Sequence, residues 1–547
     1  MTLLAGAAPE DADAPEDGGV SAGPGLAAPL LQLPVGRRAA RALLLAAVFL
    51  CAACGLVYEL ALITLGQYLV GGSVTQTSLV LGVFVCSMGL GSLASKPLLP
   101  TAAAGFAAVE LALALAGGLS VLGLYAAYSW LGLYTPALIA TSVLVGGLIG
   151  AEIPLLMSLL QRIRQQDAGA AAADLFAADY VGALAGGLAF PFLLLPVFGQ
   201  VRGAIVVAAV NLLAAVGIVV LLRHALSARA RRLVTAGVVV VALVLAAAAA
   251  VSGQFLISAR QALYDDPVVV SERSAYQEIV LTETLPSLRG PADVRLFLDG
   301  DLQFSTTDEH RYHEALVHPA VLRGARSVLV LGGGDGLAAR EVLRHGSVRR
   351  VVEVELDPAV LRLARTDPRL LAANRGSLDD PRVQVVEADA MTWLRTATEL
   401  FDAIVVDMPD PDSPATAKLY SQEFYGLAAR ALAPGGRLVV QAGSPYFAPQ
   451  AFWCIGATVA AAGLSVTPYH VDVPSFGDWG FVLAARGAAP VPTVDPVVAQ
   501  GLRFLDSDVL AAAAVFPRDR PADRTIEIST LDRPRILTYE ARGWRSY

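Results

Sequence analysis

The chain is poor in charged residues. Only 16% of its 547 residues are charged, whereas 55% are hydrophobic. Soluble domains are usually about 25% charged, which excludes a chain that is soluble throughout. Basic side chains are also not in excess, since 40 Lys and Arg face 48 Asp and Glu. This balance gives no basic surface for nucleic acid, and no nucleic-acid partner is expected.

Cysteine is scarce as well. Four cysteines are too few and too scattered for a disulfide framework. Cys51 and Cys54 form a CxxC inside an apolar segment, but there is no second pair to complete a zinc site. We therefore expect them to pack within a helix, and we expect no metal site.

The chain also shows no secretory signal peptide. Residues 1–36 are acidic and rich in Ala, Pro and Gly, a composition typical of a disordered tail.

Long apolar runs fill the N-terminal half. A helix needs about 20 apolar residues to cross the hydrocarbon core of a bilayer, and only helices satisfy their own backbone there. Seven runs meet this length: 42–65, 76–95, 103–127, 135–159, 177–198, 203–222 and 232–251. Residues 37–252 are thus predicted to form a multi-pass helical membrane domain with about seven spans in the lipid bilayer.

Five acids interrupt these runs: Glu59, Glu110, Glu152, Asp174 and Asp179. Carboxylates inside a membrane are costly and usually face a bundle interior or a cavity. They could form a transport or lipid-substrate site, or could simply bond to neighbouring helices. The sequence leaves both readings open.

From Ser271 the chain reads like a soluble enzyme. The runs Glu278–Thr282 and Val294–Leu298 predict short strands around a Pro/Gly turn, and a helix is expected over Glu309–Val321. Residues 258–320 are therefore assigned to a small β subdomain and its following helix.

A strand, a glycine loop and a helix follow. Ser327–Leu331 is an apolar run typical of a buried parallel strand, and it leads into Gly332, Gly333, Gly334 and Gly336. The next strand, Arg350–Glu355, ends in an acid about 20 residues after the glycines, the spacing of a ribose-binding carboxylate. Residues 321–490 are predicted to form an α/β Rossmann-like domain of the S-adenosylmethionine-methyltransferase type, followed by a C-terminal extension at 491–547.

More acids follow later strands. Val383–Val386 leads to Asp389, and Phe401–Val406 leads to Asp407 and Asp410. Open α/β sheets bind ligands at these carboxyl ends of strands. The glycine loop lacks GxxxxGK[ST] and carries Asp335, which would repel a pyrophosphate. A cationic nucleoside, such as an S-adenosyl sulfonium, is the expected ligand.

These motifs together resemble the spermidine synthase family. The segments Leu298-Asp-Gly-Asp-Leu-Gln303, Asp308–Glu314 and Gly332–Gly336 occur in its order and spacing, and the similarity covers about residues 264–485. With its apolar N-terminal half, the chain is similar to the membrane-bound polyamine aminopropyltransferases of bacteria. The resemblance implies aminopropyl transfer from decarboxylated S-adenosylmethionine, a co-substrate, to a diamine such as putrescine. It implies no resident cofactor, and it allows a homo-oligomer.

The resemblance also implies roles for single residues. Asp335 would hold the aminopropyl ammonium, Glu355 the ribose and Asp389 the adenine. Asp407 would be the general base for the attacking amine, although it could instead cap a strand end. The other residues implied to contact the nucleoside are Gln277, Ala390 and Pro414, and those implied to line the polyamine site are Tyr312, His313 and Asp410.

Other side chains carry plainer expectations. His313 could instead be an ordinary helix residue. His310 and His318 are expected at the surface or in packing contacts, and Trp393, Trp453 and Trp479 in the core.

Departures from the family pattern lie on the acceptor side. Ser413 replaces a glycine after Asp410-Pro, and Phe476 stands where soluble members commonly have tyrosine. Gln441 is not followed by the usual glutamate. Two rival functions remain: an S-adenosylmethionine-dependent methyltransferase, and a polyamine-binding transporter or sensor with a non-catalytic domain.

The orientation in the expected inner (cell) membrane follows from Lys and Arg, which are enriched in cytoplasmic loops. With seven spans, one side holds Arg37, Arg38, Arg41, Lys96, Arg162, Arg164, Arg223, Arg229, Arg231 and Arg232, and the loops of the other side hold Arg202. This predicts a cytoplasmic N-terminus and an external C-terminal domain. A cytosolic nucleoside substrate instead predicts a cytoplasmic catalytic domain.

Overall fold

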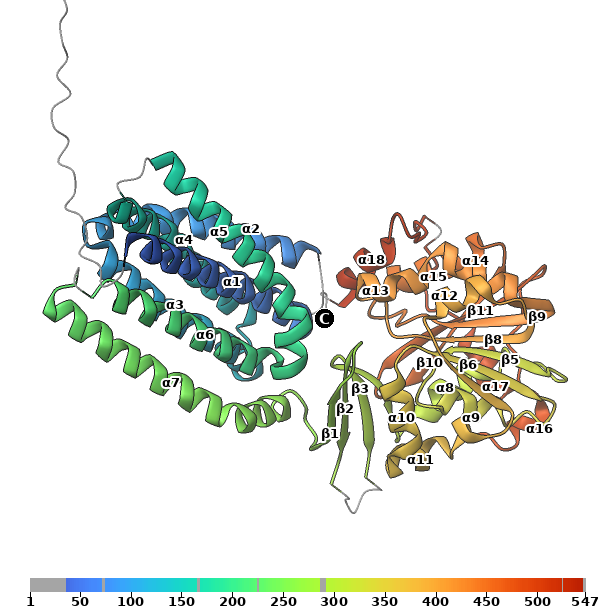
Figure 1. Cartoon of the computed structure of the whole chain (residues 1–547). Coiled ribbons are helices and arrows are strands. Elements are labelled where there is room, and N and C mark those ends of the chain that lie inside the picture. Colours follow the sequence, from blue (N-terminus) through green and yellow to red (C-terminus); the bar gives the residue numbers. More distant parts are fainter. Residues whose placement is uncertain are drawn as a thin grey trace, which may run out of the picture.

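The computed structural model describes residues 36–70, 74–164, 168–223, 226–285, 292–523 and 525–544. Most of the expected disordered tail at 1–36 lies outside these residues. A helical bundle forms one end of the described structure and an α/β domain the other (Figure 1). The bundle helices are α1 (Arg37–Val70), α2 (Val74–Ala94), α3 (Ala102–Ala126), α4 (Tyr134–Arg164), α5 (Ala168–Ala189), α6 (Leu195–Leu221) and α7 (Ala228–Gln261).

Within the described residues, six continuous helical runs are long and apolar enough to cross a membrane. One of them, Gly169–Leu221, has 53 residues and combines α5 and α6. At 1.5 Å per residue it would span roughly 80 Å as a straight helix, far more than a hydrocarbon core of about 30 Å. Gly199, with a φ of 68° and non-helical ψ, interrupts it. This run therefore divides into two helices, α5 and α6.

The two halves of this run pack in opposite directions. Gly182 and Gly186 of α5 lie against Phe49 and Ala53 of α1, so these helices run parallel and approach closely. Helix α6 returns alongside α1 and α3. The bundle thus passes up and down seven times, and the start of α1 lies at the opposite end of the bundle from the α/β domain (Figure 1).

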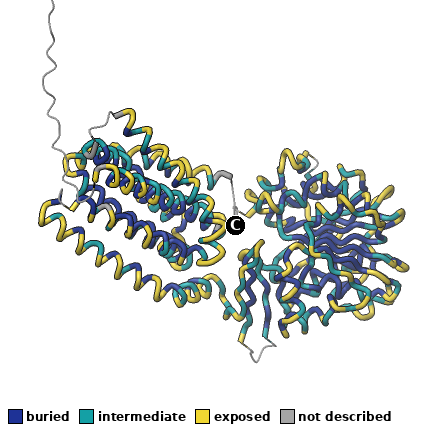
Figure 2. Tube along the Cα trace, viewed as in Figure 1, coloured by how far each residue is buried: buried dark blue, intermediate teal, exposed yellow. Residues whose placement is uncertain are grey.

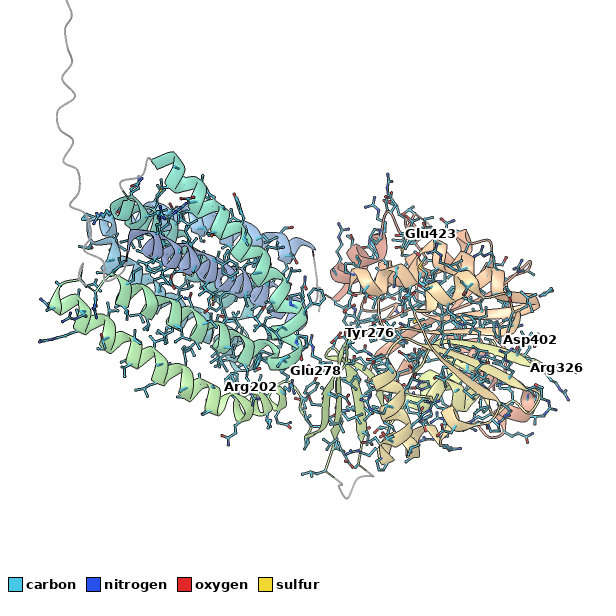
Figure 3. All side chains as sticks on the ribbon, in the orientation of Figure 1. Arg202, Tyr276, Glu278, Arg326, Asp402 and Glu423 are labelled. Carbon is cyan, nitrogen blue, oxygen red and sulfur yellow. The ribbon has the colours of Figure 1, made fainter. Side chains whose placement is uncertain are left out.

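A short junction joins the bundle to the β subdomain. Arg260, at the end of α7, forms an ion pair of 3.2 Å with Glu278, and the Tyr68 hydroxyl of α1 donates to the same carboxylate. The Arg273 guanidinium lies 4.4 Å from the centre of the Tyr68 ring. Figure 3 shows Glu278 and Tyr276 where the two halves meet. Burial raises the pKa of Glu278 to about 7.

The β subdomain is a four-stranded antiparallel sheet in the order β1-β2-β3-β4. Its strands are β1 (Val268–Arg273), β2 (Glu278–Glu283), β3 (Val294–Leu298) and β4 (Asp301–Ser305). Asp299 and Gly300 form the turn between β3 and β4, both with positive φ, as tight hairpins require. The predicted strands at 278–282 and 294–298 are confirmed.

A seven-stranded sheet forms the main domain, in the order β10-β11-β9-β8-β5-β6-β7. The five strands from β5 to β9 pair in parallel, and β10 and β11 add an antiparallel hairpin at one edge. The strands are β5 (Ser327–Gly332), β6 (Arg350–Glu355), β7 (Val383–Glu387), β8 (Phe401–Asp407), β9 (Leu432–Gln441), β10 (Ser465–Val473) and β11 (Gly477–Ala485).

Helices cover both faces of this sheet, and its central strands are almost wholly buried, whereas the edge strands β7 and β10 are more exposed (Figure 2). Val328 and Val330 of β5 pack on one side with α8 and α9, whereas Leu329 and Leu331 pack on the other with α12, α14 and α15. These helices are α8 (Glu309–Val317), α9 (Leu337–Val342), α10 (Pro358–Thr366), α11 (Pro368–Asn374), α12 (Ala390–Thr396), α13 (Pro414–Ala417), α14 (Gln422–Ala431) and α15 (Pro449–Ala461).

The last described helices are α16 (Pro496–Ala499), α17 (Ser507–Ala513) and α18 (Arg535–Trp544). They pack on the α/β domain rather than trail from it. Ile536 is fully buried in the core, and the Trp544 ring stacks on Phe447 with ring centres 5.3 Å apart.

Candidate active site

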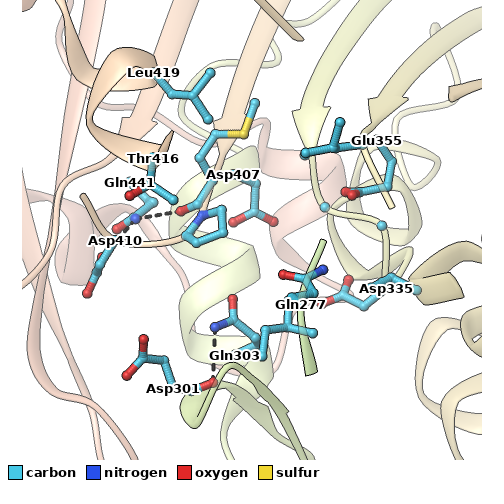
Figure 4. A pocket seen from close by; sticks show the side chains of 18 of the residues that line it. Gln277, Asp301, Gln303, Asp335, Glu355, Asp407, Asp410, Thr416, Leu419 and Gln441 are labelled. Carbon is cyan, nitrogen blue, oxygen red and sulfur yellow. Dashed lines mark hydrogen bonds between the residues drawn. The ribbon is translucent and has the colours of Figure 1, made fainter. Parts of the chain in front are cut away.

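A cavity of about 330 Å³ lies between the β subdomain, α8 and the carboxyl ends of the central strands. Acids reach it from several elements, and Figure 4 shows Asp335, Glu355 and Asp407 around one space, with Asp301 and Asp410 on the far side of Asp407. Its volume suits a small-molecule ligand.

The glycine loop after β5 allows the backbone to come close to its neighbours. Gly332 and Gly333 have φ of 82° and 71°, and the Gly333 amide donates to the Asp407 carbonyl over 3.1 Å. A Cβ at Gly332 would lie 2.1 Å from that oxygen, and one at Gly334 would lie 2.7 Å from the Glu355 Cγ. Only glycine allows this loop and the Glu355 side chain to share the space.

Asp335 and Glu355 form the acidic wall beside this loop. Burial raises the pKa of Asp335 to about 6, while the charge of His313 opposes the rise. Burial likewise raises the pKa of Glu355 to about 7, against hydrogen bonds from backbone amides. One of these, from Asp357, reaches Glu355 Oε1 over 2.9 Å. Both acids would gain from a ligand that brings positive charge or hydroxyl donors.

Asp407 ends strand β8 at the centre of the cavity. The Tyr312 hydroxyl of α8 donates to its Oδ1 over 2.6 Å. Burial raises the pKa of Asp407, while the charge of His313 and this hydrogen bond lower it. The carboxylate is thus desolvated yet held in a fixed position, as a general base requires.

His313 supplies positive charge behind these acids. Its Nδ1 lies 2.8 Å from the Glu309 carbonyl and 3.1 Å from the Glu309 carboxylate. Burial lowers the pKa of His313, but the hydrogen bond to Glu309 and the charge of Glu309 outweigh it and raise the pKa to about 9. Arg340 also binds Glu309, over 2.7 Å. An imidazolium here stabilises the ionised carboxylates around it.

Asp389 has partners of its own. Its Oδ1 caps α12 by accepting from the Thr392 amide over 2.8 Å, and its Oδ2 lies 2.6 Å from Lys418 Nζ. Burial raises its pKa, but Lys418 and Thr392 outweigh this and hold the pKa below the ordinary value. Asp389 therefore lines the cavity with both oxygens engaged.

Asp410 and Asp301 lie on the other side of Asp407. Gln441 donates to Asp410 Oδ1 over 3.0 Å and also to the Met408 carbonyl over 2.7 Å. Burial raises the pKa of Asp410 to about 6 and that of Asp301 to about 7, and the charge of Asp412 adds to both, with Asp410 adding further to the pKa of Asp301. A cation between them would be strongly favoured.

The structure brings most of the predicted site residues together. Those that line the cavity are Gln277, Tyr312, His313, Gly332, Gly333, Gly334, Asp335, Glu355, Asp389, Ala390, Asp407 and Asp410. Gly336 instead precedes α9, and Pro414 is exposed at the start of α13, between the lining residues Ser413 and Ala415. Their individual roles stay predictions.

Sequence reasoning missed several lining residues. Asp301 and Gln303 stand in the quoted Leu298–Gln303 motif, so a signal for them existed. Lys418 had no such signal. Trp479, expected in the core, is mostly buried but lines the cavity. His318 is buried against His345 and Glu341, which fits its expected packing role.

The fold and this cavity define an enzyme of the Rossmann-like class, with a cluster of acids at the carboxyl ends of the strands. The model of the spermine/spermidine synthase domain matches residues 309–495. Polyamine aminopropyltransferase 1 of Streptomyces coelicolor is 56% identical over 512 residues, which cover 93% of this chain and 96% of that protein.

Two further proteins are similar to the chain. Polyamine aminopropyltransferase of Mycobacterium tuberculosis is 56% identical over 519 residues, 92% of this chain and 97% of that protein. A solved spermidine synthase from Thermotoga maritima is 30% identical, with a TM-score of 0.42, and the match covers 46% of this chain and 85% of the other. The chain belongs to the polyamine aminopropyltransferase family, and it is a transferase.

Proposed function

We propose that the protein transfers the aminopropyl group of decarboxylated S-adenosylmethionine to a diamine, in first place putrescine, giving spermidine and 5′-methylthioadenosine. One observation carries the proposal: Asp407, bonded to Tyr312, lies between two acidic walls of one cavity. Such a cavity suits two cationic reactants that meet at a base.

The donor is proposed to bind on the side of the glycine loop. Asp335 would take the aminopropyl ammonium, and Glu355 the ribose hydroxyls. Both have raised pKa values that a cation or hydroxyl donors would relieve. Asp389 would meet the adenine amino group, which requires that it share its oxygens with Lys418 and Thr392.

The proposed chemical step is a displacement at carbon. The amine nitrogen attacks the aminopropyl carbon next to the sulfonium, the new N–C bond forms, and the C–S bond breaks to leave a neutral thioether. Asp407 takes the proton that the attacking nitrogen loses. Tyr312 would orient Asp407, and the His313 cation would help keep it ionised. Because His313 is cationic, it would act on the acids rather than bind a polyamine ammonium.

The acceptor is proposed to bind between Asp410 and Asp301, because their burial and the nearby charge of Asp412 favour an ammonium there. Ser413 caps α13 by accepting from the Thr416 amide over 3.2 Å, a bond that glycine could not make. The Phe476 ring packs edge-on to Tyr312. These two departures shape the wall on which the acceptor would rest.

We also propose that the catalytic domain faces the cytoplasm, where its nucleoside donor is made. In the seven-pass bundle the start of α1 lies at the other end, so the expected cytoplasmic N-terminus and a cytoplasmic catalytic domain exclude each other. The enzyme must reach its donor in order to work, whereas the enrichment of Lys and Arg in cytoplasmic loops is only a statistical tendency, so we give access to the donor more weight. Fusion reporters at each terminus test this: an active cytoplasmic reporter is expected at the C-terminus only, and the reverse pattern would overturn the orientation.

The activity is tested with the detergent-purified full chain and a panel of diamines. With decarboxylated S-adenosylmethionine, we expect methylthioadenosine release that depends on the diamine. With S-adenosylmethionine itself, no S-adenosylhomocysteine is expected, and its appearance would support a methyltransferase instead. Nucleoside binding without release for any amine would overturn the proposal and favour a sensor or transporter.

A further inference from the structure

A second set of buried polar groups lies inside the bundle, far along the chain from the cavity residues. Cys51 of α1, Glu110 of α3 and Glu152 of α4 each turn one ligand atom toward a common point, and these atoms all lie within 4.8 Å of one another. The Cys51 Sγ is 3.1 Å from Glu110 Oε1. Glu110 lies about 12 Å along α3 from its start, well inside the thickness of a hydrocarbon core.

This cluster is not satisfied by its own hydrogen bonds. Glu110 and Glu152 are 0% and 4% exposed, yet Glu110 Oε2 and Glu152 Oε1 have no hydrogen-bond partner among the described residues. Asn211 of α6 is 0% exposed and close enough to Glu110 to interact with it, but neither atom of its side-chain amide makes a hydrogen bond of normal length and angle among the described residues. Polar atoms without partners destabilise the folded protein when they are shielded from water, unless a ligand binds them.

We propose that Cys51, Glu110 and Glu152 bind one divalent cation of the zinc class. A thiolate with two carboxylates is a ligand set that zinc accepts, with three protein ligands and one open position. The buried side chain of Asn211, beside Glu110, is the nearest candidate for the fourth position. The Cys51 thiol releases its proton on binding, and the thiolate and two carboxylates then bring three negative charges to the two positive charges of the ion.

The CxxC itself is not the site. The Cys54 Sγ points elsewhere, to the Val207 carbonyl at 3.7 Å. Cys51 finds its partners 59 residues away and farther, on other helices. This is why the sequence, which shows only two neighbouring cysteines, predicts no metal.

The size of the site favours a single ion over a polyamine. The adjoining cavity, bounded by Cys51, Glu152 and Asp179 among others, holds only about 10 Å³. That volume takes roughly one water molecule, and a diamine chain would not fit. Asp179 also lines this cavity and is half-buried, so it adds a third carboxylate beside the cluster.

The test measures metal directly on the purified full chain, produced with an affinity tag that contains no histidine. After incubation with zinc sulfate and removal of free ion, about one zinc per chain is expected by elemental analysis. The probe cobalt(II) should give a thiolate-to-cobalt charge-transfer band. Zinc content no higher than in the variants below would overturn the proposal.

Conservative variants separate this site from other acids. Glu110→Gln and Glu152→Gln should each weaken zinc binding at least about 10-fold. Cys51→Ser should remove the cobalt band. Glu59→Gln, a half-buried acid of the same bundle, is the matched control and should retain both signals. Equal retention in all four variants would place the bound ion elsewhere and contradict the site.

Discussion

The two halves of the molecule bury carboxylates in opposite ways. In the α/β domain, Asp335, Asp407 and Asp410 surround a cavity of about 330 Å³. In the bundle, Glu152 adjoins a space of only about 10 Å³, and Glu110 lies beside it in the same cluster. The first set has a cationic imidazolium at its back, whereas the bundle supplies Cys51 and Asn211, which are neutral. On our proposals, the buried acids of the α/β domain take part in the reaction, whereas those of the bundle bind an ion.

Glycines mark the same contrast. In the bundle they let helices touch: a Cβ at Gly91 of α2 would lie 1.9 Å from the Gly147 carbonyl of α4. In the α/β domain they let a loop approach side chains, as at Gly334 beside Glu355. The same residue serves backbone packing in one region and ligand access in the other.

The largest effect on activity is expected for the proposed general base of the α/β domain. Asp407→Asn keeps the shape but removes the base, so kcat for methylthioadenosine release should fall about 10²- to 10⁴-fold. Donor affinity, measured by calorimetry, should change little.

Asp402→Asn is the matched control, because Asp402 stands at the other end of the same strand, far from the cavity (Figure 3). It accepts from the Arg326 and Ser327 amides, a role that asparagine can keep. If kcat fell equally in the two variants, Asp407 would act by stabilising the strand. The proposed difference between a catalytic acid at one end of β8 and a structural acid at the other would then be wrong.

A next effect concerns the donor. Asp335→Asn removes the charge proposed to hold the aminopropyl ammonium, so the KM for decarboxylated S-adenosylmethionine should rise about 10- to 100-fold. The pKa of Asp335 is about 6 in the free protein, so protonation should weaken donor binding as the pH falls through 6. Above that pH the carboxylate is ionised and binding should reach a plateau.

Calorimetric titration of the donor against pH checks this prediction. The pH dependence near 6 should be much smaller in Asp335→Asn. A dependence that persists unchanged in this variant would assign the titration to another acid, such as Glu355.

Much of the central sheet could be predicted from the sequence. Arg350–Glu355 is β6 as predicted, and Ser327–Leu331 and Phe401–Val406 differ from β5 and β8 by one residue. These strands are buried on both faces, so they appear as mainly apolar runs that end in a polar residue, although β6 also carries the buried Glu353. The acids at their ends were found for the same reason.

The rest depends on contacts between distant segments. The Pro414 side chain is exposed because the Ser413 cap sets the start of α13, which spacing alone does not reveal. Lys418 reaches Asp389 across 29 residues, and Glu110 reaches Cys51 across 59. No local pattern encodes such pairs. The break at Gly199, by contrast, falls between the apolar runs 177–198 and 203–222, which the sequence already separates.

The glycine contrast predicts a stability effect confined to the bundle. Gly91→Ala would force a methyl group against the backbone of α4, and overpacking of this kind costs about 1–3 kcal/mol. The melting temperature of the detergent-purified chain should fall. Gly89→Ala, two residues away with open space at its Cβ, should leave it unchanged or slightly raised.

If both alanine variants melted like the parent protein, the close approach of α2 and α4 would be wrong. A matching pair exists in the other half: Gly334→Ala should raise the KM for the donor, while Gly346→Ala, with nothing near its Cβ, should not.

The smallest effect refines how the reactive acid is kept ionised. Tyr312→Phe removes the 2.6 Å hydrogen bond to Asp407. The bond also fixes the position of the Asp407 carboxylate, so the loss of this orientation should lower kcat at high pH about 10-fold. That bond lowers the pKa of Asp407, so its loss should raise the pKa. The base then loses its proton at a higher pH, and the acidic limb of the pH–kcat profile should move to higher pH.

Tyr425→Phe is the control, because the buried Tyr425 hydroxyl has no hydrogen-bond partner among the described residues. If the profile of Tyr312→Phe matched that of this control, the charge of His313 alone would set the ionisation of Asp407. The cation, and not the hydroxyl group, would then be the feature that distinguishes the acids of the α/β domain from those of the bundle.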